Sequence, residues 1–133
     1  MSLKAELRYA PLPYIGALAW HYWFVVSGHR WEVWQAKNAG GSSCIGHVHC
    51  DLKAPEDGVG GGPSRVAMTW DGDEARRILG VLNRIETYPH CHRYHYWPGP
   101  NSNSFVAWVL REARIDYPLD PRGIGKNYFT AKQ

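Results

Sequence analysis

A run of largely apolar residues at 17–26, followed by a turn sequence and a second apolar run, constrains the fold more than any other feature. Residues 17–26 are rich in aromatic and β-branched side chains and the run is shorter than most helices, which favours a buried β-strand. Residues 27–30 contain a glycine and predict a turn, and residues 31–36 return as the second strand. The sequence therefore predicts a β-hairpin in the core.

The alternation of side chains along a strand divides this hairpin into two faces. With the turn at residues 27–30, one face carries Tyr22, Phe24, Val26, Trp31 and Val33. The other face carries His21, Trp23, Glu32 and Trp34. This assignment depends on the register, because a slip by one residue would exchange the two faces.

Further strands are expected at residues 3–9, 44–52, 64–70 and 90–97, the first of them as an edge strand that ends before two prolines. Two helices are expected. The first begins at residues 71–74 and carries Ile78, Leu79, Leu82 and Ile85 at helical spacing, and the second covers residues 101–115, with Phe105, Val109 and Leu110 facing inward. We predict one α+β domain over residues 1–133, in which an antiparallel sheet of about four to six strands packs against the two helices.

Composition and charge narrow the classes of partner. The net charge of +3 comes from scattered lysines and arginines, which argues against nucleic-acid binding. No segment approaches the ~18 apolar residues of a membrane span, so no membrane partner is expected. Three cysteines cannot all pair within the chain, which favours a reducing compartment and a cytoplasmic location. The sequence indicates no cofactor, and the oligomeric state stays open.

The segment Pro98-Gly-Pro-Asn-Ser-Asn-Ser-Phe105 is the strongest candidate for a functional motif. It predicts a tight turn that brings Asn101 and Ser102 to the first turn of a helix, where backbone N–H groups are unpaired and the helix dipole is positive. These N–H groups could hold an oxyanion if Ser102 were a nucleophile. The same residue types are also those required for a helix cap, so the segment has two interpretations.

The wider pattern resembles a bacterial family known only as domain of unknown function 3750. The likeness rests on Tyr96-Trp97, the Pro-Gly-Pro-Asn-Ser-Asn-Ser-Phe segment, and a Gly-Lys-Asn-Tyr sequence at residues 125–128. Ser104 and Asn127 are the departures, since the family motifs have threonine and aspartate there. This resemblance spans most of the chain and names no activity.

A more distant resemblance is to permuted papain-like enzymes, which include the NlpC-like amidases and the lecithin-retinol acyltransferase group. It implies that His21 is the catalytic histidine and that Ser102 stands where those enzymes carry cysteine. A third polar residue orients the histidine in such sites, and Glu32 or Gln35 is the candidate, with Glu32 favoured by the predicted face. A serine needs more help to ionise than a thiol, so the resemblance supports the fold better than catalysis.

Several side chains near this motif are candidates for binding a small-molecule or peptide substrate. They are Asn101, Asn103, Ser104, Trp23, Tyr96 and Trp97. Aromatic side chains this abundant are expected to form part of the core and part of a groove.

Two histidine-rich segments are weak candidates for a metal site. Imidazole and thiolate are zinc ligands, and the candidates are His47, His49, His90, Cys91 and His92. Their spacing matches no established zinc motif, which favours histidines that pack or hydrogen-bond, so we expect no resident metal. Cys91 is also an alternative nucleophile, but its neighbouring histidines would point to the other face of a strand.

Three functions follow from these candidates. The first is a hydrolase or acyltransferase that acts on an amide or ester through Ser102 and His21. The second is a non-catalytic module that binds a peptide, a lipid or a cell-wall fragment in the same cleft. The third is a metal-binding protein.

Overall fold

The computed structural model describes residues 3–37 and 43–128 of the chain. Its centre is an antiparallel sheet of six strands in the order β4-β5-β3-β2-β1-β6. The strands are β1 Lys4–Pro11, β2 Trp20–Val26, β3 His29–Val33, β4 Ser43–Ile45, β5 Val48–Cys50 and β6 Arg65–Asp71. The helices are α1 Gly72–Leu82 and α2 Ser102–Glu112, with a short 3₁₀ turn at Ile85–Thr87. The predicted α+β class is confirmed.

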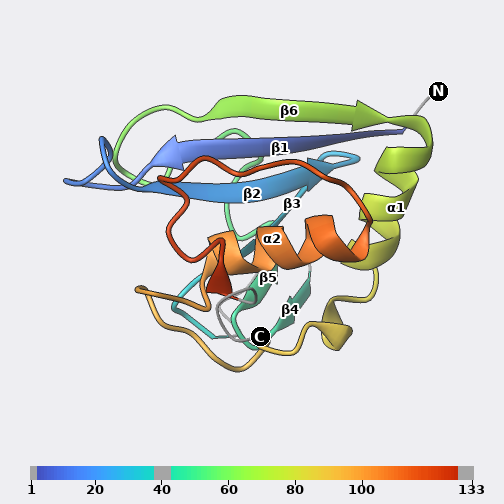
Figure 1. Ribbon diagram of the computed structural model, residues 1–133. Helices are drawn as coiled ribbons and strands as arrows, with labels where there is room; N and C mark the ends of the chain where they lie inside the picture. Colours follow the sequence, from blue (N-terminus) through green and yellow to red (C-terminus); the bar gives the residue numbers. More distant parts are fainter. Residues whose placement is uncertain (1–2, 38–42, 129–133) are drawn as a thin grey trace.

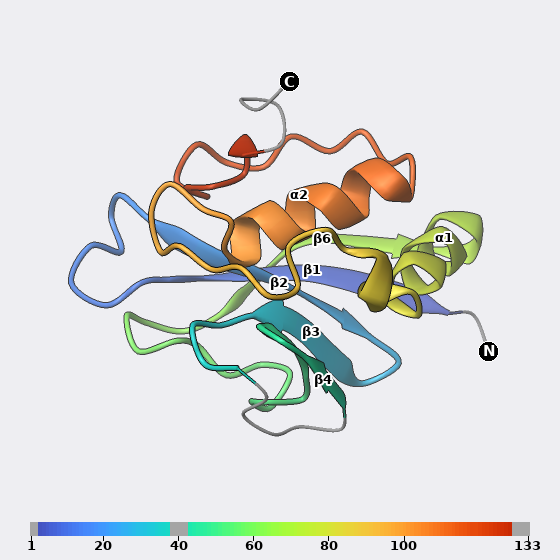
Figure 2. The ribbon, with the colours of Figure 1, turned by 90° about the horizontal axis from the view of Figure 1, so that it is seen from below.

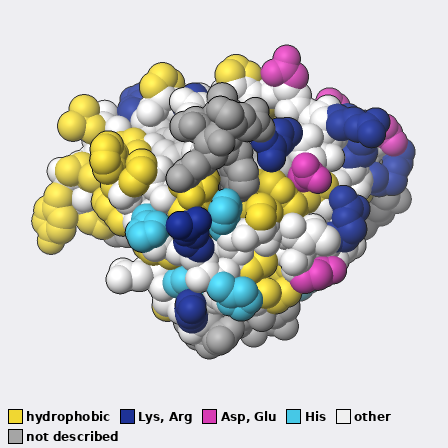
Figure 3. Space-filling view, turned by 60° about the horizontal axis from the view of Figure 1, so that its bottom comes forward, with side chains coloured by type: hydrophobic (Ala, Val, Ile, Leu, Met, Phe, Trp, Pro, Cys, Tyr) yellow, Lys and Arg dark blue, Asp and Glu magenta, His cyan; other side chains and the backbone are white. Residues whose placement is uncertain are grey.

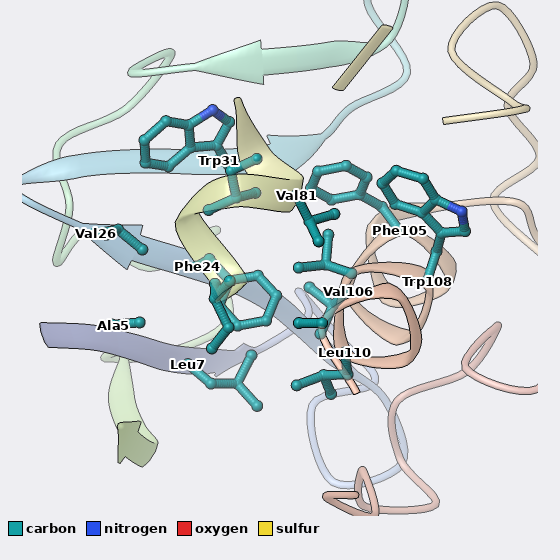
Figure 4. Close-up of a cluster of buried hydrophobic side chains, with 14 of the residues drawn as sticks. Ala5, Leu7, Phe24, Val26, Trp31, Val81, Phe105, Val106, Trp108 and Leu110 are labelled. Carbon is teal, nitrogen blue, oxygen red and sulfur yellow. The ribbon is translucent and has the colours of Figure 1, made fainter. Parts of the chain in front are cut away.

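Both helices cover the same face of the sheet (Figures 1 and 2). Phe24 of β2 and Leu7 of β1 point toward Phe105, Val106 and Leu110 of α2 in a continuous buried cluster (Figure 4). The opposite face of β2 and β3 lies under residues 54–57, whose carbonyl groups accept hydrogen bonds from Trp23 and Arg30. Most side chains of the central hairpin are therefore buried on one side or the other of the sheet, whereas His29 beside the turn is exposed.

The predicted hairpin is present with the predicted faces, but its turn is shorter than the predicted residues 27–30, so that His29 and Arg30 belong to β3. Ser27 and Gly28 form the turn with φ values of 53° and 78°, a backbone region that glycine enters without strain. Phe24 pairs with Trp31, which places the even-numbered residues of β2 toward the helices and His21 on the opposite face.

Three predicted elements differ from the structure. The strand at the N-terminus is not an edge strand, because β1 pairs with β2 on one side and β6 on the other before the prolines end it. Residues 44–52 form two short strands, since Gly46 turns the chain between β4 and β5. Residues 90–97 form no strand, and their backbone instead meets separate loops, with His95 N–H donating to Pro100 O and Cys91 O accepting from His47 N–H.

In the part of the chain that the structure describes, no helix has the length and apolar character that crossing a membrane would require.

Candidate binding cavity and histidine site

A cavity of about 430 Å³ opens where strands β2 and β3 part. Their ladder runs from Val26 and His29 to Phe24 and Trp31, so residues 20–23 of β2 and 32–33 of β3 lie beyond its end. The wall of the cavity is largely apolar and includes six aromatic side chains, Tyr14, Trp20, Trp34, Tyr94, Tyr96 and Trp97. The polar side chains that reach it are His21, Gln35, Asn101, Ser102 and Asn103. A mostly apolar cavity with a few convergent polar groups is the usual form of a small-molecule site.

The N-terminus of α2 is one wall of this cavity. The side-chain oxygen of Asn101 accepts hydrogen bonds from the backbone N–H groups of Asn103 and Ser104, at 2.9 and 3.2 Å. The Ser104 hydroxyl accepts from the Asn101 N–H, which completes a capping box, and donates to Gly125 O at 2.7 Å. Asn101 and Ser104 thus tie the helix start to the C-terminal loop.

Ser102 and Asn103 join α2 to the two parting strands. The Ser102 hydroxyl donates to Tyr22 O at 2.8 Å and accepts from Val33 N–H at 3.2 Å. Asn103 accepts from Tyr22 N–H at 2.9 Å and donates to Trp20 O at 2.8 Å. These side chains take over backbone groups that the β2–β3 ladder would otherwise pair. Neither hydrogen bond of Ser102 goes to a histidine.

His21 lines the cavity from the face of β2 that lies away from the helices. Its Nε2 lies 2.7 Å from Glu32 Oε1, on the neighbouring strand. Glu32 is also paired with Arg30, whose Nε lies 2.7 Å from Oε2, and both of these side chains are fully buried. Arg30 stacks on the Trp23 ring at 3.9 Å and donates to two backbone carbonyls. The side chains of Glu32 and Arg30 therefore form a buried ion pair behind the imidazole of His21. This pair fixes the orientation of the imidazole, as is required of a positioned acid, base or hydrogen-bonding group.

Burial tends to raise the pKa of Glu32, but the hydrogen bond from His21, the charge that His21 carries when protonated, and the charge of Arg30 outweigh it. The pKa of this carboxyl is consequently below its ordinary value of 4.5. A carboxylate whose pKa is lowered by folding stabilises the folded state above its unfolded pKa, and this contribution disappears as the pH falls through the lower folded value.

The free energy of unfolding should therefore decline below about pH 4.5, and part of that decline should be absent from the Glu32→Gln variant. Urea unfolding at a series of pH values between 7 and 3 measures it. Identical pH profiles for the two proteins would contradict the assignment.

Most of the predicted site residues meet at the cavity. Ser102, His21, Asn101 and Asn103 line it, with Tyr96 and Trp97 at its exposed rim. Glu32 lies behind His21, within hydrogen-bonding distance of its Nε2. Two predicted binding residues lie elsewhere: Trp23 is buried against Arg30, and Ser104 is buried against the C-terminal loop.

Two parts of the site were missing from the sequence prediction. Arg30 was assigned to the turn, although its spacing of two from Glu32 would place both side chains on one face of a strand. Residues 12–15 and Trp34 were not predicted to line the cavity. The sequence feature that could have indicated residues 12–15 is the apolar run that begins among the prolines. In the structure, Tyr14 and Leu18 are the most exposed side chains of this run. Figure 3 shows hydrophobic side chains gathered at one end of the molecule.

The candidate metal ligands do not form one site. His47 Nδ1 hydrogen-bonds to Trp34 O at 3.0 Å and His49 Nε2 to Ala36 O at 2.9 Å. The Cys91 thiol donates to Ile85 O and Tyr88 O, and burial raises its pKa, which makes it a poor nucleophile. Among the described residues, no three of the five candidates lie close enough together to share an ion.

A sequence model of one family, described as a protein of unknown function (DUF3750), matches residues 3–128. No curated protein and no solved structure matches the chain.

Proposed function

Because the chain belongs to the DUF3750 family, whose description names no activity, its function has to be inferred from the site, and we propose that it binds a small amphipathic molecule in the aromatic cavity. The observation that carries this proposal is the His21 imidazole, fixed by Glu32 and facing a cavity of about 430 Å³ with aromatic walls. Its volume is within the range of ~300–1,000 Å³ typical of small-molecule sites.

The hydrogen-bonding state of His21 suggests which polar group the ligand carries. Glu32 is ionised at neutral pH, because its pKa is lowered, and its carboxylate therefore accepts a hydrogen bond from His21 Nε2–H. In the neutral state of the imidazole, this hydrogen bond places the proton on Nε2 and leaves Nδ1 as an acceptor. Nδ1 makes no hydrogen bond within the described part of the chain. A ligand with an apolar body and a hydroxyl or amide N–H group matches this arrangement.

Two probes of equal chain length test the proposal. Octanamide has an N–H donor and methyl octanoate has none. Calorimetric titration should show octanamide binding more tightly, by roughly 3–10-fold, as expected for one hydrogen bond. The preference should disappear in His21→Leu and persist in His92→Gln, a histidine that is exposed and does not line the cavity. Binding of neither probe, or an unchanged preference in His21→Leu, would overturn the proposal.

A second candidate is amide or ester hydrolysis of the permuted papain-like kind. It is favoured by Ser102 and His21 lining one cavity, with Glu32 behind the histidine. Against it, the Ser102 proton is donated to Tyr22 O, so attack would require that bond to break and the proton to pass to His21.

A fluorophosphonate followed by peptide mapping separates the two functions. The binding proposal predicts no adduct at Ser102 under conditions that label a control serine hydrolase. An adduct at Ser102 that is lost in His21→Leu would establish the hydrolase instead.

A further inference from the structure

Three metal-ligating side chains meet at the end of β3 that lies away from the cavity. His29 begins β3, Cys50 ends β5, and Asp51 follows it directly. His29 Nδ1 lies 2.6 Å from Asp51 Oδ2, and Cys50 Sγ lies 3.7 Å from the same oxygen. All three ligand atoms are within 4.8 Å of one another. We infer that His29, Cys50 and Asp51 form a binding site for a zinc-like divalent cation.

The spacing of the three atoms suits such an ion. Atoms separated in this way can all lie within about 2.4 Å of one point, close to the ~2.3 Å of a Zn–S bond and the ~2.0–2.2 Å of Zn–N and Zn–O bonds. The short distance between Nδ1 and Oδ2 is a hydrogen bond, which widens when its proton is replaced by the metal. The His29 side chain is 54% exposed and so has room for this adjustment.

The backbone of β3 already orients the carboxylate. Asp51 Oδ1 accepts from Arg30 N–H at 2.9 Å, and Asp51 N–H donates to Arg30 O at 2.8 Å. These bonds leave Oδ2 directed toward His29 and Cys50. Supporting hydrogen bonds of this kind fix the ligands of protein metal sites.

The chemistry of the ligand set selects the class of ion. One thiolate, one imidazole and one carboxylate suit zinc, cobalt and similar borderline ions better than magnesium or calcium, which prefer oxygen ligands alone. Binding releases the thiol proton, and His29 ligates through Nδ1 with its own proton on Nε2. The exposed side of His29 leaves the fourth coordination position to water, the arrangement of an open zinc site.

Cobalt(II) is the direct probe, because a thiolate ligand gives it an intense charge-transfer absorption. The full-length chain should bind one equivalent with this absorption, and zinc should displace it. Cys50→Ser should lose the absorption and weaken binding, as should Asp51→Asn, which keeps the hydrogen bond from Arg30, and His29→Gln. The loss of affinity should exceed about 100-fold, since even supporting residues contribute ~10–100-fold.

Cys91→Ser and His92→Gln are the matched controls and should bind cobalt as the unchanged protein does. Their side chains belong to the other histidine-rich segment and contribute no ligand here. The inference is overturned if no stoichiometric cobalt or zinc binds, or if any of the three ligand variants keeps near-normal affinity.

Discussion

Replacing Glu32 with glutamine is expected to lower the free energy of unfolding by about 3–5 kcal/mol, because the change leaves a buried guanidinium without its counter-charge. Arg30 and Glu32 are both fully buried, and Arg30 Nε lies 2.7 Å from the carboxylate. Glutamine keeps the size of the side chain and a hydrogen-bond acceptor for His21, so the loss measures the charge. Urea unfolding monitored by tryptophan fluorescence measures it.

The exposed ion pair between Asp73 and Arg77 provides the control. Its atoms lie 2.6 Å apart, as close as those of the buried pair, but the Asp73 side chain is 74% exposed. Asp73→Asn should therefore cost under about 1 kcal/mol. The double variant Arg30→Met, Glu32→Leu should recover most of the stability, because it removes both buried charges. A cost for Glu32→Gln no larger than that of Asp73→Asn would refute the role given to this pair.

Asn103→Ala is the second change with a large expected effect, about 2–4 kcal/mol. Its amide accepts from Tyr22 N–H and donates to Trp20 O and Ile124 O, at 2.8 to 2.9 Å. Removing it leaves buried backbone groups unpaired where β2 and β3 part. Asn103→Asp keeps the acceptor for Tyr22 and loses both donors, so it should also destabilise the protein.

Asn127→Ala is the matched control, since Asn127 is exposed and its side-chain oxygen accepts a hydrogen bond from the neighbouring Lys126. Thermal and urea unfolding of the three variants measure the difference. If Asn103→Ala were within about 0.5 kcal/mol of Asn127→Ala, the Asn-Ser-Asn segment would not be the structural junction described above.

The sequence predicted the parts of the fold that depend on local pattern. The turn was predicted two residues too long, at residues 27–30, but the shift by two kept the alternation of faces, so His21 and Glu32 were correctly placed on one face. Asn101 was likewise predicted as a helix cap from its residue type alone. In both cases the deciding interactions are between residues close in sequence or in one hairpin.

The features of the fold and of the site that the sequence did not predict depend on contacts between residues far apart in the chain. The pairing of β1 with β6 joins residues about sixty positions apart, and no pattern within β1 distinguishes an interior from an edge strand. Ser102 was a candidate nucleophile from its place at the predicted helix start, and its hydrogen bonds with Tyr22 O and Val33 N–H could not be predicted, because they join residues 80 and 69 positions apart. The cavity lies where β2 and β3 part, and no local sequence motif predicts this position.

The indole N–H resonances of the seven tryptophans test most directly whether the aromatic cavity binds an amphipathic ligand. Trp20, Trp34 and Trp97 line the cavity, whereas the others do not: Trp23, Trp31, Trp70 and Trp108. Titration with octanamide, followed by ¹⁵N-resolved NMR, should shift the first three resonances in a saturable manner and leave the other four in place. Unchanged cavity resonances at saturating octanamide, or shifts confined to the other four, would contradict the account.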